Sequence, residues 1–293
     1  MHVPVMAEKV VGYLHPADGA VYLDATAGEG GHARALLDAS APGGSVVCVD
    51  IDDQSLRTVE TNLRDFGDRV KLIRANYKDI PEIARQAGVR GFDGIVLDLG
   101  FNLSQVDDAA RGFSFSSDGP LDMRYDRSHG ITAYEVVNTF RPDKLEDIIR
   151  EYGEERHSRG VVRAIVKARE KARIECTAVL ASVIAGAVHG RSRTHPATRT
   201  FQAIRIYVND EMGNLKGFLE AVKDFLNVGG VLVIVSFHSL EDRIVKAAFR
   251  RLSTLSAPSF RILTRKPVTP DADELSVNRR ARSAKLRAIE RLN

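Results

Sequence analysis

Short apolar runs alternate with amphipathic stretches through the first hundred residues of the chain. Four of these runs have the composition and length of buried strands, at 21–24, 45–50, 69–73 and 93–100. Between the second and third runs, apolar residues recur at helical spacing, as with Leu56, Val59, Leu63 and Phe66. Strands separated by single helices are typical of βαβ units, so the pattern predicts a parallel sheet.

The alternation stops after the fourth strand and returns near the C-terminus. Residues 107–211 show helical periodicity, turns and charge but no convincing strand. After an amphipathic helix that we expect to be capped by Gly229-Gly230, three more strands are predicted, at 231–237, 261–264 and 282–288. The pattern predicts a doubly wound α/β fold in a discontinuous domain, residues 1–106 and 212–293, with 107–211 as a helical insertion.

Composition narrows the class of protein. Of the 293 residues, 44% are hydrophobic, which is enough to build a large core. No apolar run approaches the roughly 20 residues that a membrane-spanning helix needs, and the first residues lack a signal-peptide pattern. Cys48 and Cys176 lie far apart without metal-ligand spacing. We therefore expect a cytoplasmic protein without a required metal site.

The stretch DATAGEGGHA, residues 24–33, lies between the first predicted strand and the first helix of the sheet domain. From Gly28 its spacing fits G-x-G-x-x-A, a variant of the dinucleotide fingerprint. This spacing alone allows a pyrophosphate, a triphosphate or a sulfonium cofactor. No Lys-Ser/Thr pair follows the glycines, which removes the triphosphate interpretation.

Acidic residues distinguish between the two remaining ligands, a pyrophosphate and a sulfonium cofactor. Glu29 lies in the loop itself, and Asp50 and Asp98 end the second and fourth predicted strands. A carboxylate at close range disfavours a pyrophosphate, whereas a cationic sulfonium is attracted to it. The acidic set therefore favours S-adenosylmethionine. The alternative without a ligand is that the glycines make a tight turn and Asp50 caps the next helix.

Longer strings elsewhere resemble a known family. RGFSF (111–115), YGEER (152–156), TRTFQAIRI (198–206) and SFHSLEDRIVK (236–246) resemble, nearly word for word, the bacterial RsmH (MraW) family. That family uses S-adenosylmethionine to methylate N4 of a cytidine in the decoding centre of 16S ribosomal RNA. The resemblance covers essentially the whole chain. It implies a class I, Rossmann-like methyltransferase sheet of seven strands, interrupted by a mostly helical domain for substrate recognition.

The resemblance also implies a set of cofactor contacts. By motif they fall on Gly30, Gly31, His32, Asp50, Tyr77, Asp98 and Gln105. In this assignment His32 and the loop amides lie near the methionine end, Asp50 binds the ribose, and Tyr77 packs on the adenine where the family usually has Phe. The segment DLGFNLSQVD departs from the family's DLGVSSPQLD at Asn102-Leu103, which bears on local substrate contacts.

The chemistry of N4 methylation suggests candidate catalytic residues. Neither cysteine lies in a catalytic motif, and methylation of an exocyclic amine needs no covalent intermediate, so in-line positioning supplies most of the rate. Asp98 is the candidate acceptor for an amine N–H. Ser236 and His238, at the end of the strand at 231–237, are further candidates. The alternative for the latter pair is structural: Ser239 caps the next helix and His238 bonds a backbone carbonyl.

Basic residues in the insertion point to RNA. Those expected on one helix face are Arg156, Arg159, Arg163, Lys167 and Lys171. Such a stripe suits phosphate contacts, although a solvated helix face has the same pattern. Phe113 and Phe115 either stack on a flipped base or belong to the core.

The expected partner is 16S rRNA or the small ribosomal subunit, without a membrane, and the sequence leaves open whether the chain is a homodimer. The alternative functions are an NAD-dependent oxidoreductase and a non-catalytic ribosome-assembly factor.

Overall fold

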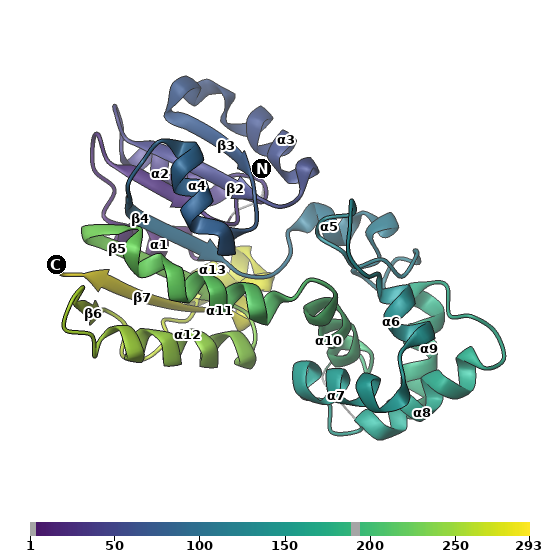
Figure 1. Ribbon diagram of the computed structural model, residues 1–293. Helices are drawn as coiled ribbons and strands as arrows, with labels where there is room; N and C mark the ends of the chain where they lie inside the picture. The colour runs from purple at the N-terminus through teal and green to yellow at the C-terminus, as the bar shows by residue number, and fades with distance from the viewer. Residues whose placement is uncertain (1–3, 189–193) are drawn as a thin grey trace. The chain divides into compact units, whose positions relative to one another are not determined.

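The computed structural model describes residues 4–188 and 194–293, which divide into two compact units (Figure 1). One unit contains residues 1–100 and 212–293, and the other contains residues 101–211. The first division thus falls before residue 101, whereas the sequence placed it after residue 106. The reason is local packing, because the ring of Phe101 lies 6.2 Å from that of Phe113 within the second unit.

The first unit is built on a seven-stranded sheet with the order β3-β2-β1-β4-β5-β7-β6. Its strands are β1 (Val21–Asp24), β2 (Ser45–Asp50), β3 (Val70–Arg74), β4 (Phe92–Asp98), β5 (Leu226–Ser236), β6 (Phe260–Ile262) and β7 (Lys285–Arg291). The first five are parallel, whereas β7 runs antiparallel to both of its neighbours. This confirms the predicted α/β class and the seven strands. The strand order reverses between β1 and β4, which is where such sheets bind ligands.

Helices cover both faces of the sheet (Figure 1). They are α1 (Ala7–Leu14), α2 (Gly31–Ala39), α3 (Asp53–Leu63), α4 (Ile80–Ala87), α11 (Glu211–Ala221), α12 (Ser239–Leu252) and α13 (Ala272–Val277). Alternate residues along each strand enter different cores: Leu23 packs with Ile83 and Phe218 on one face, and Tyr22 packs with Leu36 on the other. The continuous apolar runs are explained by this burial on both faces.

One local prediction in this unit was wrong. Gly229-Gly230 does not cap a helix, because α11 ends at Ala221 and both glycines lie inside β5. Gly229 adopts a φ of 79° where the pairing with β4 shifts register, and this extends β5 back to Leu226. The third strand ends at Arg74, so Tyr77 lies beyond it in a short 3₁₀ turn, Tyr77–Asp79.

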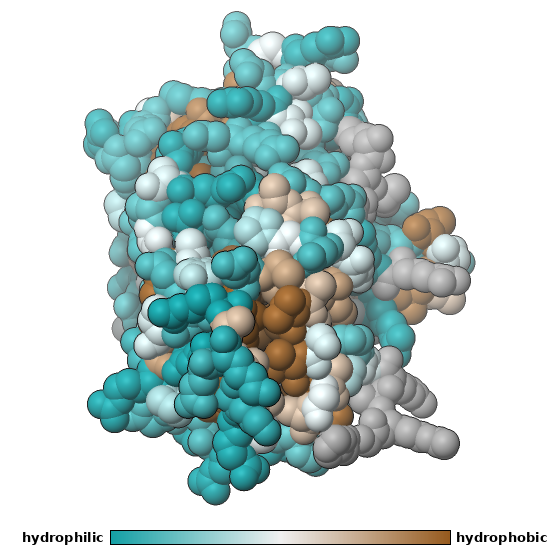
Figure 2. Space-filling view, turned by 90° about the vertical axis from the view of Figure 1, so that its right-hand side faces the viewer, coloured by the Kyte–Doolittle hydropathy of each residue, from teal (hydrophilic) through white to brown (hydrophobic). Residues whose placement is uncertain are grey.

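The second unit is helical. It contains α5 (Leu103–Asp107), α6 (Ala133–Thr139), α7 (Pro142–Gly153), α8 (Ser158–Arg169), α9 (Thr177–Ala187) and α10 (Thr198–Val208), and its described residues form no strand. Its own apolar core includes Val136, Ile149, Ile165, Leu180 and Ile204. Burial of these helix faces explains why the surface in Figure 2 is largely hydrophilic, with hydrophobic residues gathered mainly near the centre of the view. No helix among the described residues has both the length and the apolar character to cross a membrane.

Candidate active site

The carboxylate of Asp24, at the end of β1, fixes the loop between β1 and α2 through hydrogen bonds. Its Oδ1 accepts a hydrogen bond from the amide of Thr26 at 3.3 Å, and its Oδ2 accepts one from the amide of Ala33 at 3.1 Å. The side chain is buried, and this burial raises the pKa of Asp24 to about 6. One residue at the end of a strand therefore fixes both the start of the glycine loop and the first turn of α2.

Glycines are required in this loop by geometry. Gly30 precedes α2 with a φ of 85°, a conformation that side chains rarely adopt. A Cβ on Gly31 would lie 3.0 Å from the Cβ of Pro4. The N-cap residue Gly30 has no side chain, and among the first amides of α2 the side chain of Asp24 binds the amide of Ala33. The other amides of its first turn can therefore bind an anionic group such as a carboxylate.

His32 and Asp98 meet beside this helix end. Nε2 of His32 lies 3.4 Å from Oδ2 of Asp98. Burial alone would lower the pKa of His32, but Asp98 and then Asp24 outweigh it and raise that pKa. Within the described part of the chain, neither ring nitrogen of His32 nor Oδ1 of Asp98 has a hydrogen-bond partner. Buried polar atoms without partners are costly, so they mark a place where a ligand is expected to bind.

Asp50 lies at the end of β2 and faces the same loop. Its Oδ2 accepts from the amide of Gly28 at 3.0 Å and its Oδ1 from the amide of Asp52 at 2.9 Å. Burial raises the pKa of Asp50 to about 7. Each oxygen retains a second lone pair for a hydroxyl donor. The alternative in which Asp50 caps the next helix is wrong, because Asp52 caps α3 by accepting from the amide of Gln54.

Tyr77 and Gln105 lie in different units. Tyr77 packs edge-to-face on Phe218, with ring centroids 5.8 Å apart, in the sheet unit. Gln105 is buried in the helical unit, where its Oε1 accepts from the amide of Asn102 and its own amide donates to Oδ1 of Asn102. The departure at Asn102 thus forms the capping box that begins α5. The cofactor roles of Tyr77 and Gln105 stay predictions.

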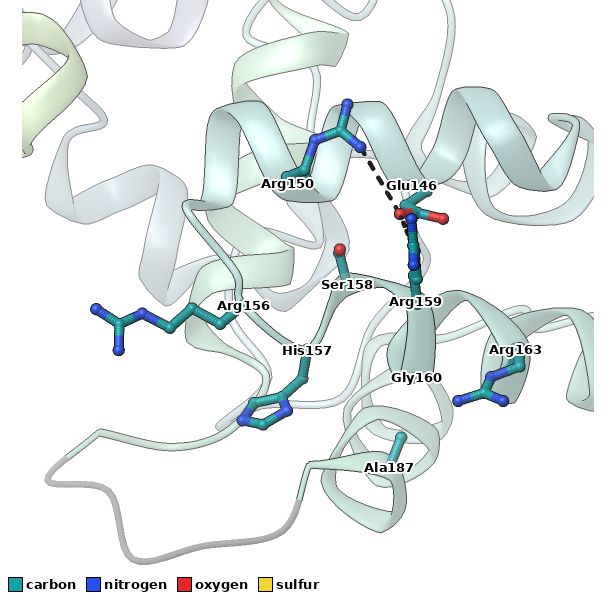
Figure 3. A pocket seen from close by; sticks show the side chains of 9 residues that line it. All are labelled: Glu146, Arg150, Arg156, His157, Ser158, Arg159, Gly160, Arg163 and Ala187. Atoms are coloured by element: carbon teal, nitrogen blue, oxygen red, sulfur yellow. Dashed lines mark hydrogen bonds and ion pairs between the residues drawn. The ribbon is translucent and has the colours of Figure 1, made fainter.

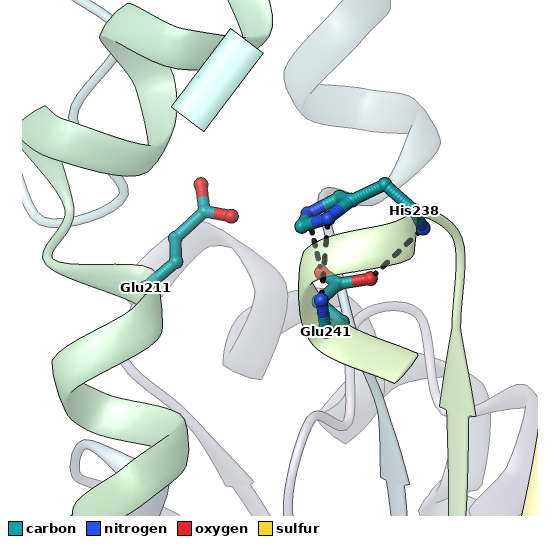
Figure 4. A group of neighbouring side chains, drawn as sticks. All are labelled: Glu211, His238 and Glu241. Carbon is teal, nitrogen blue, oxygen red and sulfur yellow. Dashed lines mark hydrogen bonds and ion pairs between the residues drawn. The ribbon is translucent and has the colours of Figure 1, made fainter. Parts of the chain in front are cut away.

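Ser236 and His238 follow one another at the end of β5, beside β4. The hydroxyl of Ser236 donates to the carbonyl of Lys285 at 3.3 Å. Nδ1 of His238 accepts from the amide of Glu241, and Nε2 lies 3.0 Å from Oε1 of that glutamate (Figure 4). His238, not Ser239, is therefore the N-cap of α12, and the predicted cap at Ser239 was wrong. The catalytic roles of Ser236 and His238 stay predictions.

The chemistry of these groups fits a ligand of mixed charge. The amino end of α2 suits a carboxylate, while Asp24, Asp50 and Asp98 suit a cation and hydroxyl donors. S-adenosylmethionine carries an α-carboxylate, an ammonium, a sulfonium and a ribose, so the residues present fit it. A pyrophosphate would instead face three carboxylates.

Comparison with known proteins then decides the family. The family model described as "MraW methylase family" matches residues 1–292. The chain belongs to the MraW methylase family.

Three relatives share the name ribosomal RNA small subunit methyltransferase H. Those of Syntrophus aciditrophicus, Syntrophotalea carbinolica and Thermotoga neapolitana are 43%, 45% and 45% identical to this chain. Each alignment covers 99% of this chain, and 98%, 98% and 95% of the respective relative. Among solved structures, an rRNA methylase of Streptococcus thermophilus aligns with 98% of this chain and 94% of its own at a TM-score of 0.45 and 13% identity.

As a member of the MraW methylase family, the protein is an S-adenosylmethionine-dependent methyltransferase. The comparisons support neither an NAD-dependent oxidoreductase nor a non-catalytic assembly factor.

The candidate site contains two residues that the sequence analysis did not assign. Asp24 holds the loop, as described above, and the hydroxyl of Thr26 accepts from the amide of Asp98 at 2.7 Å. This bond ties the loop after β1 to the end of β4. The place of Asp24 at a strand end was a signal that could have identified it. Thr26 gave no such signal, because only the fold brings it to Asp98.

The aromatic and basic residues of this family member also have defined places. Phe113 stacks on Tyr125 at 5.4 Å, and Phe115 packs on Phe201 at 5.1 Å. Both side chains are partly buried against the helical core, which favours the core interpretation over base stacking. On α8 and just beside it, the basic side chains that the sequence placed on one face are all exposed: Arg156, Arg159, Arg163, Lys167 and Lys171.

Proposed function

We propose that this protein transfers the methyl group of S-adenosylmethionine to the exocyclic N4 of a cytidine in the decoding centre of 16S rRNA. The names of the relatives support a small-subunit ribosomal RNA substrate. The observation that carries the chemistry is the pair of His32 and Asp98 beside the amino end of α2. We also propose that the helical unit recognises the substrate and that the enzyme works in the cytoplasm, where this RNA is found.

Asp98 is suited to accept a hydrogen bond from the target amine and then to take its proton. Its Oδ2 lies beside His32, whereas its buried Oδ1 has no partner among the described residues. An amine N–H that donates to Oδ1 gains electron density on nitrogen, and the carboxylate can take the proton after transfer. Bound S-adenosylmethionine supplies an electrophilic methyl group on a sulfonium. Nε2 of His32 lies beside Oδ2 of Asp98, and this carboxylate contributes to the raised pKa of His32.

The cysteines fit a reaction at the amine better than one at C5 of the ring, which needs a thiolate nucleophile. Cys48 is fully buried in β2, and burial raises the pKa of its thiol well above the usual value. Such a thiol is inert.

Transfer of labelled methyl groups to small ribosomal subunits that lack the modification tests the proposal. We expect label in N4-methylcytidine after nuclease digestion, and none in subunits that already carry the modification. Label in another nucleoside, or none, would overturn the proposed substrate or reaction.

The role of Asp98 needs a separate test. Asp98→Asn keeps the size of the side chain but removes the proton acceptor, so turnover should fall by about 10²-fold or more. The assay is run at saturating S-adenosylmethionine, with cofactor binding measured by calorimetry. Full turnover in Asp98→Asn would exclude Asp98 as the acceptor. A matched His238→Gln variant with an unchanged pH–rate profile would leave His238 as a helix cap only.

A further inference from the structure

A pocket of about 500 Å³ lies in the helical unit, where α7 faces the start of α8 (Figure 3). Its lining residues are Glu146, Arg150, Arg156, His157, Ser158, Arg159, Gly160, Arg163 and Ala187. Four of these are arginines and one is acidic. No residue of the site described above lines it. The pocket therefore attracts anions in a part of the chain to which no step of methyl transfer has been assigned.

The four arginines are not equivalent. Glu146 accepts from Nε of Arg159 at 3.1 Å and lies 3.7 Å from Arg150, so it offsets the charge of those two. Arg156 and Arg163 are exposed, and no described residue forms an ion pair with either. Their guanidinium groups extend at opposite ends of the lining in Figure 3. Two cations are thus available to a ligand, and guanidinium groups suit phosphate oxygens.

The start of α8 adds neutral donors to these charges. The helix contains 12 residues, and no side chain of a described residue caps it. Ser158 is 5% exposed and lines the pocket, yet its hydroxyl forms no hydrogen bond with the described residues. In Figure 3 its side chain points into the space between α7 and α8. The hydroxyl of Ser158 and the first amides of α8 are therefore donors beside the pocket, and they suit a ligand that accepts hydrogen bonds.

We propose that this pocket binds the phosphate backbone of the RNA substrate, with Arg156 and Arg163 as ionic contacts and Ser158 and the α8 amides as hydrogen-bond donors. This rests on the proposed function, which supplies the RNA. Each phosphodiester of the backbone carries a negative charge and exposed oxygens, which suit guanidinium groups and a helix N-terminus. The site contributes affinity and register but no base selection.

Gly160 offers a substitution that tests the pocket without removing any of its contacts. It occupies the first turn of α8, where a Cβ would meet only the carbonyl oxygen of Ala187, at 3.8 Å. Gly160→Asp places a negative charge in the pocket, while an acidic residue in a first helical turn favours the helix. Gly160→Ala is the control for shape. Gly12→Asp, on α1 where nothing lies within 4 Å of an added Cβ, is the control for net charge.

The measurement is binding of unmodified small ribosomal subunits at several salt concentrations, with the full-length protein. We expect Gly160→Asp to weaken binding about tenfold at low salt and to lower the slope of log K against log[salt] by about 1. In methyl transfer it should raise KM for the subunit and leave kcat unchanged. Gly160→Ala and Gly12→Asp should behave as the wild type. Thermal unfolding of all variants shows whether each is folded.

Arg163→Ala provides a second test if Gly160→Asp fails to fold, with Arg90→Ala, before β4, as its control. Unchanged subunit binding and salt slope in folded Gly160→Asp and Arg163→Ala would overturn the proposal. So would binding of inorganic phosphate that these variants abolish while subunit binding persists, because the site would then serve free phosphate. Failure of the proposed function has a different signature: the wild type would bind S-adenosylmethionine yet transfer no methyl group to the subunit.

Discussion

The ionised carboxylate of Asp50 should destabilise the ligand-free protein at neutral pH. The same ionised form is the one that we expect to bind the cofactor. Its pKa is raised from 3.8 to about 7 by burial. The native state therefore holds a proton that the unfolded chain releases between about pH 4 and pH 7, so stability falls as pH rises through this window. Each pH unit corresponds to about 1.4 kcal/mol, which sets an upper limit near 4 kcal/mol. Because the side chain is only partly buried, we expect about 1–3 kcal/mol.

Asp50→Asn removes this pH dependence. An amide oxygen accepts from only one of the two backbone amides that the carboxylate binds, so the variant loses a hydrogen bond at every pH. The informative quantity is therefore the difference in unfolding free energy between variant and wild type. Between pH 5 and pH 8, the unfolding free energy of Asp50→Asn should rise by about 1–3 kcal/mol relative to that of the wild type.

If Asp50 binds the ribose as predicted, the ribose hydroxyls donate to the ionised carboxylate, and the affinity for the cofactor should show the opposite dependence on pH. With a pKa of about 7, roughly nine tenths of Asp50 is ionised at pH 8 and roughly one tenth at pH 6. The affinity for S-adenosylmethionine should therefore fall about tenfold between these values in the wild type, and much less in Asp50→Asn.

Urea unfolding without ligand at pH 5, 6, 7 and 8, and calorimetry with S-adenosylmethionine, measure the two effects. Parallel stability curves for wild type and Asp50→Asn would show that the carboxyl has an ordinary pKa in the folded protein. A pH-independent affinity of the wild type would show that its charge does not bind the ribose. Either result refutes the reasoning.

Three further predictions concern buried groups. Asp24→Ala leaves two backbone amides of the loop without their acceptor, so it should lower the unfolding free energy by about 2–4 kcal/mol and weaken S-adenosylmethionine binding, as denaturation and calorimetry would show; normal affinity would contradict the loop-holding role. Arg205→Ala strands the buried carboxylate of Glu211, which it binds through two contacts of 2.7 and 2.9 Å, and should cost about 3–5 kcal/mol in the same denaturation assay; a loss below 1 kcal/mol would mean that water screens the pair. Cys48 should react with a thiol reagent only after unfolding, and Cys48→Ala should keep full turnover, since its thiol is buried and takes no part in the proposed reaction; rapid labelling of folded protein would refute this.

Much of the fold could be predicted because burial leaves a periodic record in the sequence. The apolar runs that become β1, β2 and β4 are continuous because helices cover both faces of the sheet. Where a segment bends, the periodic pattern no longer predicts the secondary structure. Gly229-Gly230 resembles a helix end, but register with β4 places both glycines inside β5. A local pattern holds no information on such pairing.

The sequence by itself determined the sheet architecture, the family and the acidic character of the site, since each depends on residue types and spacing along the chain. Tertiary structure alone decided which groups meet. It placed His32 beside Asp98 and let the amide of Asp98 donate a hydrogen bond to the hydroxyl of Thr26. It also made His238 the N-cap of α12. The start of α8 likewise became a pocket only where α7 packs beside it. The physical reason is that hydrogen bonds and charge pairs act over a few ångströms, between atoms that only folding brings within reach.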